Sequence, residues 1–187
     1  MHINYAIADS PLGRLLVAAT ERGVCSVQFG DGDEELEAAL AAEYPAADIK
    51  RDEARLGGAV ESLLRHLEGS RPDLSLPLDV QATAFQLRVW EELRRIPYGS
   101  TRSYSEVAAA LGQPTATRAV ARACATNPVA LVTPCHRVVR AGGALGGYRW
   151  GVARKERLLE QEGGGAAGDD ETGDDETRLP FESNARA

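Results

Sequence analysis

Residues 103–124, SYSEVAAALGQPTATRAVARAC, decide the fold of the second half of this chain. The segment begins with a capping box, because Ser103 is followed three residues later by Glu106, and the apolar run after it ends at Gly112. A short turn then leads into a further helical run over about 116–125. Two short helices joined by a glycine-containing turn are typical of a helix-turn-helix. Helical hairpins are also common elsewhere, so this pattern alone leaves DNA binding open.

The neighbouring helical patterns add detail. In the run after the turn, Arg118 and Arg122 lie one turn apart on the same face, as a DNA-recognition helix requires. The alternative is two solvated arginines, which we favour for Arg122. Upstream, Thr83 and Gln86 form a second capping box, and apolar residues recur at helical spacing up to Ile96. We therefore predict a third helix, ending at the sequence PYGS.

The charge of the chain is unevenly distributed. The 187 residues are 43% apolar, which suits a globular core, and carry a net charge of −7. Residues 163–187 hold seven acidic residues and two arginines, a net charge of −5, so residues 1–162 carry only −2. The second half of that remainder is rich in arginine and therefore compatible with phosphate contacts. The end of the chain repeats GDDET and has almost nothing to bury, so we predict an acidic disordered tail over 164–187.

The first 80 residues predict a lobe that mixes strands and helices. INYAIADSPLGRLLVAAT gives two apolar runs around a Ser-Pro-Leu-Gly turn, and GVCSVQFG gives a third short strand. Helical segments follow near 34–43 and 56–67. The connector PDLSLPLD, with its two prolines, then separates this lobe from a mainly helical lobe over 81–163. The predicted fold class is α+β.

Cysteine usage and hydropathy indicate the compartment. No apolar run approaches the roughly 20 residues that span a bilayer, and the first residues lack the basic end and apolar block of a signal peptide. We therefore expect a cytoplasmic protein without membrane association. Three cysteines, Cys25, Cys124 and Cys135, are too few and too scattered for a disulfide framework, which favours a reduced compartment and a free thiol.

The sequence NPVALVTPCHRVV contains the candidate nucleophile, Cys135. A short apolar stretch leads into it, so we expect the thiol in or beside the core, where most cysteines are inert. We expect that inertness for Cys25 and Cys124. Cys135 differs because Pro134 adds rigidity and His136, Arg137 and Arg140 add positive charge, which favours thiolate over thiol.

The adjacent histidine need not face the thiol. Side chains alternate in an extended segment, so His136 would reach Cys135 only through a water or a bend in the chain. The remaining histidines, His2 and His66, belong to the first lobe. A protease-type Cys-His pair draws its histidine from a distant segment. Here the only distant histidines lie in the other lobe, which argues against this class of enzyme.

These stretches, together with GGALGGYRWGVARKERLLEQEG and YAIADSPLGRLLVAATERGVC, resemble the O6-alkylguanine-DNA alkyltransferase family, most closely the alkyltransferase half of Ada-type proteins. The resemblance covers residues 3–163 and excludes the acidic tail. It implies a ribonuclease H-like N-terminal lobe and a winged-helix-like catalytic lobe that contains the helix-turn-helix. It also implies repair of O6-alkylguanine, and of O4-alkylthymine, by irreversible self-alkylation, one lesion per protein molecule.

The resemblance implies a role for each residue of the reactive site. Cys135 attacks the O6-alkyl carbon of guanine and keeps the alkyl group as a thioether. His136 relays the proton through a water to a glutamate beyond the K-E-x-L-L helix, which matches Glu162. Asn127, in the Asn-Pro turn, supports this network.

The resemblance also implies how the base is reached. The guanine must be flipped out of the duplex, and Arg118 fills the space it leaves. Tyr104 hydrogen-bonds the guanine ring and helps it to leave. Ser105 and Gln113 match positions that contact DNA. Tyr148 forms part of the pocket wall within the glycine-rich loop GGALGGYRWG, residues 142–151.

Some positions depart from relatives of this family. Trp150 stands where other members have glycine, so we predict a tighter pocket that accepts methylguanine and reacts poorly with bulky benzyl analogues. Some relatives bind zinc in the first lobe, but Cys25, His2 and His66 show no recognisable ligand spacing, so we predict no metal and no cofactor. The expected partner is double-stranded DNA with alkylated bases, bound by a monomer.

Two other functions compete with repair. One is a binding module that senses alkylated DNA and recruits excision repair, as relatives without the cysteine do; the presence of Cys135 argues against it. The other is a DNA-binding regulator, which the reactive-site motif disfavours. Ada-type regulators also add a second methyl-acceptor domain and an activator domain, neither of which we expect in this chain.

Overall fold

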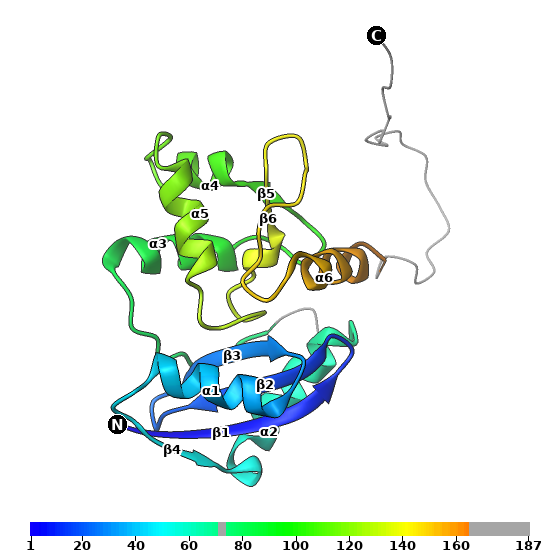
Figure 1. Cartoon of the computed structure of the whole chain (residues 1–187). Coiled ribbons are helices and arrows are strands. Elements are labelled where there is room, and N and C mark those ends of the chain that lie inside the picture. Colours follow the sequence, from blue (N-terminus) through cyan, green and yellow to red (C-terminus); the bar gives the residue numbers. More distant parts are fainter. Residues whose placement is uncertain (71–73, 165–187) are drawn as a thin grey trace.

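The computed structural model describes residues 1–70 and 74–164, which form two lobes (Figure 1). The first lobe contains a four-stranded sheet in the order β3-β2-β1-β4. Its strands are β1 (His2–Ser10), β2 (Gly13–Ala19), β3 (Val24–Gly30) and β4 (Asp48–Arg51). The first three pair antiparallel, and β4 joins β1 in parallel. The sequence did not indicate β4, because its four residues, DIKR, are mostly charged and exposed and show no apolar alternation.

Two helices cover opposite faces of this sheet (Figure 1). They are α1 (Asp33–Glu43) and α2 (Glu53–Leu67), close to the predicted ranges. Successive residues of β2 point to opposite faces, so Leu16 packs in the cluster with Leu40 of α1, whereas Leu15 packs in the cluster with Leu63 of α2. Each fully buried leucine contributes roughly 1.5–3 kcal/mol relative to exposure.

The second lobe is mainly helical, as predicted. Its elements are α3 (Ala84–Arg94), β5 (Arg102–Ser103), α4 (Tyr104–Ala110), α5 (Thr117–Ala125), the 3-10 turn η1 (Cys135–Arg137), β6 (Val138–Val139) and α6 (Val152–Gly164). Both predicted capping boxes are present, at Thr83 before α3 and at Ser103 before α4. Helices α4 and α5 form the helix-turn-helix, and Trp90 of α3 donates to the backbone oxygen of Ala123 (2.9 Å), which fixes α3 against α5. The predicted α+β class is therefore confirmed.

The second lobe sits along the β3 edge of the sheet. The Val27 amide donates to the Pro128 oxygen (2.9 Å), and the Ala130 amide donates to the Val27 oxygen (3.0 Å). The connector uses the same edge, where the Val24 amide donates to the Pro77 oxygen (2.8 Å). The edge is thereby covered, and the segment that leads to the candidate nucleophile is anchored to the first lobe.

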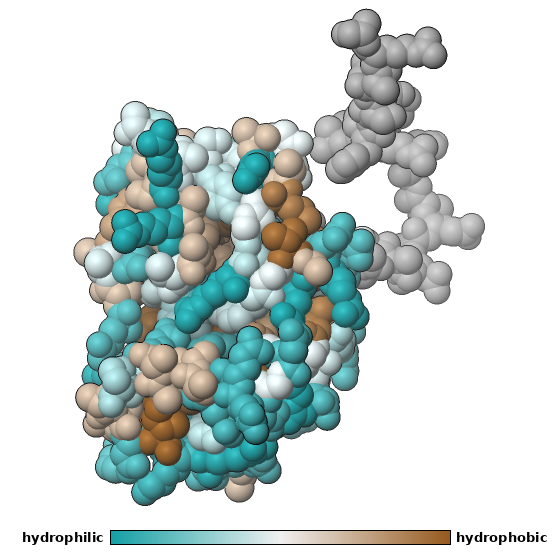
Figure 2. Space-filling model, in the orientation of Figure 1, coloured by the Kyte–Doolittle hydropathy of each residue, from teal (hydrophilic) through white to brown (hydrophobic). Residues whose placement is uncertain are grey.

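One hydrophobic cluster continues through both lobes. It contains sheet residues such as Val17, helix residues such as Trp90 and Val107, and Cys135 itself. Figure 2 shows mainly hydrophilic side chains over the first lobe on the face in view, with apolar side chains in small, separate patches. No helix among the described residues is long and apolar enough to cross a membrane. The predicted acidic tail, apart from Gly164, lies outside the described residues.

Candidate active site

Cys135 begins the turn η1 and is only 3% exposed. The side-chain amide of Asn127 donates from Nδ2 to Cys135 Sγ (3.2 Å) and to the Thr133 oxygen (2.8 Å). Its Oδ1 accepts from the Val129 amide (3.0 Å), which settles the orientation of the side chain. A donor is therefore fixed toward the sulfur, where it stabilises negative charge as the thiol loses its proton.

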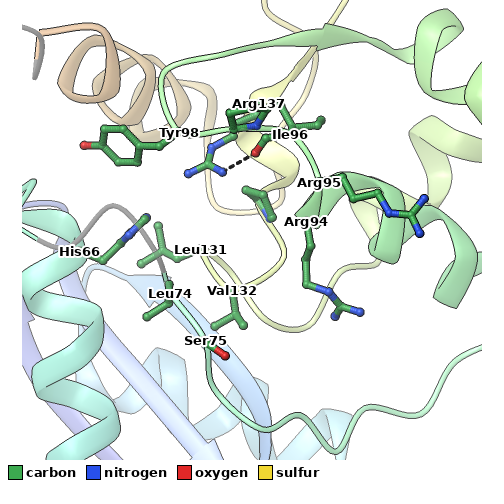
Figure 3. Close-up of a pocket in the computed structure, with 12 residues that line it drawn as sticks. His66, Leu74, Ser75, Arg94, Arg95, Ile96, Tyr98, Leu131, Val132 and Arg137 are labelled. Atoms are coloured by element: carbon green, nitrogen blue, oxygen red, sulfur yellow. Dashed lines mark hydrogen bonds between the residues drawn. The ribbon is translucent and has the colours of Figure 1, made fainter.

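The prediction that Arg137 and Arg140 place positive charge beside the thiol is wrong. Arg137 turns away and donates from Nη1 to the Ile96 oxygen (2.8 Å), as Figure 3 shows, and Arg140 is exposed. Burial raises the pKa of the Cys135 thiol above its usual value, although the Asn127 hydrogen bond and the charge of Lys155 oppose this. The resting site therefore favours a neutral thiol, which has to lose its proton during the reaction.

His136 contacts Glu162 directly. His136 Nε2 lies 2.7 Å from Glu162 Oε1, and both side chains are buried. No water can therefore lie between His136 and Glu162. A water in the expected relay would lie between Cys135 and the His136 ring. The Nδ1 atom of His136 is buried and makes no hydrogen bond to any residue that the structure describes. Glu162 also lies within α6, near its end, and not beyond this helix as expected.

Glu162 holds a buried charge. Arg137 contacts both carboxylate oxygens, through Nε (2.8 Å) and Nη2 (3.0 Å), and the Gly99 amide donates to Oε2 (3.2 Å). Burial would raise the pKa of Glu162, but the hydrogen bonds from His136 and Arg137 outweigh it and lower the pKa to about 2. Burial also lowers the pKa of His136. An ionised carboxylate only accepts, so the neutral imidazole carries its proton on Nε2, and Nδ1 is the basic atom.

Lys155 is a functional candidate that the sequence reasoning missed. It is fully buried, donates from Nζ to the Val138 oxygen (2.5 Å) and lies 5.9 Å from the centre of the Tyr104 ring. A signal was available, because Lys155, Leu158 and Glu162 recur at helical spacing and are all buried on one face of α6. A lysine on a buried helix face calls for a specific partner.

Tyr104 is the first residue of α4 and packs against the glycine-rich loop. A Cβ at Gly146 would lie 2.5 Å from the Tyr104 hydroxyl, so only glycine allows this approach. Burial raises the pKa of Tyr104 to about 12, which keeps the phenol protonated near neutral pH. The tyrosine can therefore act as a hydrogen-bond donor.

The other predicted site residues divide into two groups. Tyr148 is half-buried beside the reactive site, and burial and then the charge at Cys135 raise its pKa. Ser105, Gln113 and Arg118 are exposed on the helix-turn-helix, from α4 to α5. The structure thus gathers Cys135 with the residues of its hydrogen-bond network and leaves the predicted DNA contacts on the surface.

Trp150, near the end of the glycine-rich loop, is buried against the first lobe. Its ring lies edge-to-face with Tyr148 at 5.2 Å, and it lines a hollow together with Phe29 and Leu36. Trp150 therefore contacts Tyr148, the residue that is predicted to form part of the pocket wall. The predicted preference for small alkyl groups remains a prediction.

We expect Trp150→Gly to react with O6-benzylguanine about 5- to 10-fold faster than the unchanged protein, because an aromatic pair contributes about 1 kcal/mol to holding Tyr148. The measurement is the rate of benzyl addition by intact-protein mass spectrometry. Trp150→Phe keeps an aromatic neighbour and is the matched control. Equally fast labelling of all three proteins would contradict the tighter pocket.

A cavity of about 300 Å³, separate from the reactive site, lies between the lobes (Figure 3). Pro134 and Arg137 form part of its wall. Its lining includes Arg94, Arg95 and Tyr98, but not Cys135. Within residues 1–70 and 74–164, no group of three or more histidine, cysteine or acidic residues could hold a metal ion, and all three cysteines are free.

The fold and the site together define a class of two-lobe proteins, in which a sheet lobe is joined to a helix-turn-helix lobe that holds a buried cysteine, histidine and glutamate. Residues 3–80 match the ribonuclease-like domain of 6-O-methylguanine DNA methyltransferase, and residues 84–164 match its DNA binding domain. The chain belongs to the 6-O-methylguanine DNA methyltransferase family, which confirms the resemblance found in the sequence.

Individual relatives agree with this assignment. The chain is 49% identical over 160 residues to the bifunctional transcriptional activator/DNA repair enzyme Ada of Escherichia coli, covering 86% of this chain and 45% of that protein. It thus spans about half the length of that relative. It is 40% identical to the methylated-DNA--protein-cysteine methyltransferase of Mycolicibacterium paratuberculosis, over 86% of this chain and 92% of that protein. The crystal structure of Mycobacterium tuberculosis OGT in complex with DNA is similar with a TM-score of 0.75 and 36% identity, over 89% of this chain and 95% of that one.

Proposed function

We propose that this protein repairs O6-alkylguanine in DNA by transferring the alkyl group irreversibly to Cys135. The observation that carries the proposal is the buried thiol, held by Asn127 at 3.2 Å and followed in sequence by a histidine that an ionised carboxylate orients. It lies in the part of the chain that matches a DNA binding domain. The DNA complex of the M. tuberculosis relative and the names of the other two relatives, a DNA repair enzyme and a methylated-DNA--protein-cysteine methyltransferase, support the same function.

The transfer is a displacement at a saturated carbon. As Cys135 Sγ attacks the alkyl carbon, its proton passes to Nδ1 of His136 through one water, and the bond between that carbon and O6 breaks. Glu162 stabilises the imidazolium that forms. The electron pair leaves with the guanine, whose ring accepts a hydrogen bond from the protonated Tyr104. The product is a thioether on Cys135, so each protein molecule acts once.

The remaining assignments concern DNA. Flipping the base out of the duplex costs a few kcal/mol, and Arg118, exposed on α5, fills the space that it leaves. Ser105 and Gln113 contact DNA from the same helix-turn-helix, and Tyr148 lines the pocket. O4-alkylthymine would be a second substrate. We further propose that residues 1–80 and 81–163 form the two functional units of a monomer that works in the cytoplasm.

The test is intact-protein mass spectrometry after incubation with a duplex that contains one O6-methylguanine. We expect one added methyl group per protein, mapped to the Cys135 peptide, and none with an unmodified duplex of the same sequence. No added mass, with selective binding of the lesion duplex, would instead identify a lesion sensor and overturn the proposal.

A further inference from the structure

Arg149 connects the reactive site to the first lobe. Its Nη1 donates to the backbone oxygen of Asn127 (3.1 Å), and its Nη2 lies 3.0 Å from Oε2 of Glu43, the last residue of α1. The guanidinium also lies over the ring of Trp150, 5.6 Å from its centre. The Arg149 side chain is 29% exposed and that of Glu43 is 25% exposed, so water only partly screens this pair.

Glu43 is held in position by the sheet. Its Oε2 also accepts a hydrogen bond from Gln28 Nε2 (3.1 Å), and the same Nε2 donates to Ser26 Oγ (2.8 Å). Both Ser26 and Gln28 are buried residues of β3. The Glu43 carboxylate therefore has a defined position opposite Arg149, because the hydrogen-bonded and buried pair of Ser26 and Gln28 on strand β3 holds it.

Asn127 carries this connection to the nucleophile. Arg149 holds its backbone oxygen, while its side-chain amide donates to Cys135 Sγ and to the Thr133 oxygen. The backbone bond between Val27 and Pro128 fixes the next residue to the same strand. A shift of the Asn127 backbone would therefore move the donor that faces the sulfur. The charge of Arg149 also opposes the rise that burial causes in the pKa of Cys135.

We propose that Arg149 is a positioning residue for alkyl transfer and that Glu43 of the first lobe sets its place. Through this pair the ribonuclease-like lobe controls the geometry and reactivity of a thiol that lies in the other lobe. The inference rests on the proposed alkyl-transfer function and adds to it a role for the first lobe. The simpler alternative is that Arg149 contacts a DNA phosphate.

The experiment compares four variants with the unchanged full-length protein: Arg149→Ala, Arg149→Lys, Glu43→Gln and Asp31→Asn. The last is the matched control, because Asp31 also joins the lobes through an arginine, Arg154 (2.5 Å), but that arginine does not contact Asn127. Three quantities are measured for each: the methyl-transfer rate at saturating lesion duplex, the Kd for that duplex, and the melting temperature.

A fourth measurement needs no DNA. Methyl iodide is small enough to probe a buried thiol, and peptide mapping gives its rate of reaction at Cys135 as a function of pH. This arm reports on the thiol even if the unchanged protein takes no methyl group from DNA. Failure of the proposed function and failure of the Arg149 inference are thereby distinguishable.

We expect Arg149→Ala to transfer methyl about tenfold more slowly at saturating DNA, with a Kd within about twofold of the unchanged protein, since a hydrogen bond from a charged group contributes roughly 1.5 kcal/mol. Arg149→Lys should regain part of the rate. Glu43→Gln should slow transfer about threefold, because Arg149 keeps its bond to Asn127 but loses its charged anchor. The methyl iodide profile of Arg149→Ala should move to higher pH.

Two results would overturn the inference. A weaker Kd for Arg149→Ala with an unchanged rate at saturation and an unchanged methyl iodide profile would make Arg149 a DNA contact. Equal slowing by Asp31→Asn and Glu43→Gln, with equal loss of melting temperature, would mean that any contact between the lobes has the same effect.

Discussion

Cys135→Ser is expected to abolish methyl transfer while the protein stays folded. Serine keeps an acceptor for the Asn127 amide at nearly the same place, so the hydrogen bond that organises the turn survives. A hydroxyl, however, loses its proton far less readily than a thiol and is a weak nucleophile without a strong base. Loss of a nucleophile lowers rates by on the order of 10⁵-fold or more. The measurement is added mass on the protein after incubation with the O6-methylguanine duplex.

The other thiols provide matched controls. Cys25 is buried in the first lobe, and burial raises its pKa to about 11, so Cys25→Ala should transfer methyl at the normal rate. Binding of the lesion duplex by Cys135→Ser should stay within a few-fold of the unchanged protein. A methyl group found on Cys25 or Cys124, or on the serine variant, would contradict the assignment of the nucleophile.

Local signals were sufficient to predict most of the fold. The capping boxes at Thr83 and Ser103 fix helix starts through contacts three residues apart, so they can be read from the sequence alone. Strand β4 could not be predicted from the sequence, because its position depends on pairing with β1, about 45 residues earlier in the chain, and not on its own pattern.

The reactive site was predicted less completely, because side-chain direction depends on tertiary structure. Cys135, His136 and Arg137 are consecutive, yet the turn η1 sends the thiol toward Asn127 and the other two side chains toward Glu162. Cations that follow the cysteine in sequence therefore do not surround it in space. The family resemblance supplied the residues of the site, but not these directions.

Long-range partners explain what the sequence missed. Arg149 meets Glu43 across 106 residues, a pairing that no spacing within either segment indicates. Lys155 was different, because its place on the apolar face of α6 could have been recognised from the helical repeat. The helical repeat of a sequence can show that a charged residue lies on a buried face. Its partner can be found only from the way the two lobes pack.

Glu162→Gln is expected to lower both stability and transfer rate. The Arg137 side chain is 7% exposed and would lose its counter-charge, and breaking a buried ion pair costs about 3–5 kcal/mol. Transfer should fall on the order of 10³-fold, because an amide can donate to His136 Nε2 and so place the ring proton on Nδ1, the wrong tautomer for a base. Urea unfolding and the transfer rate at saturating duplex measure the two effects.

The stability loss should depend on pH in a defined direction. The pKa of Glu162 is about 2 in the folded protein and 4.5 as its usual value, so its contribution is complete above about pH 4.5 and is lost as the pH falls toward 2. Burial lowers the pKa of His136, so protonation of this histidine in the unfolded chain below about pH 6.5 also destabilises the fold in acid. The gap in unfolding free energy between the unchanged protein and Glu162→Gln should therefore be widest near pH 7 and narrow below pH 4.5.

Glu160→Gln is the control for this prediction, since Glu160 is an exposed carboxylate on the same helix. It should change the unfolding free energy by less than about 0.5 kcal/mol, as surface substitutions do. If Glu162→Gln proved as stable and as active as Glu160→Gln at pH 7, the buried carboxylate would neither balance Arg137 nor orient His136, and the proton of Cys135 would need another acceptor.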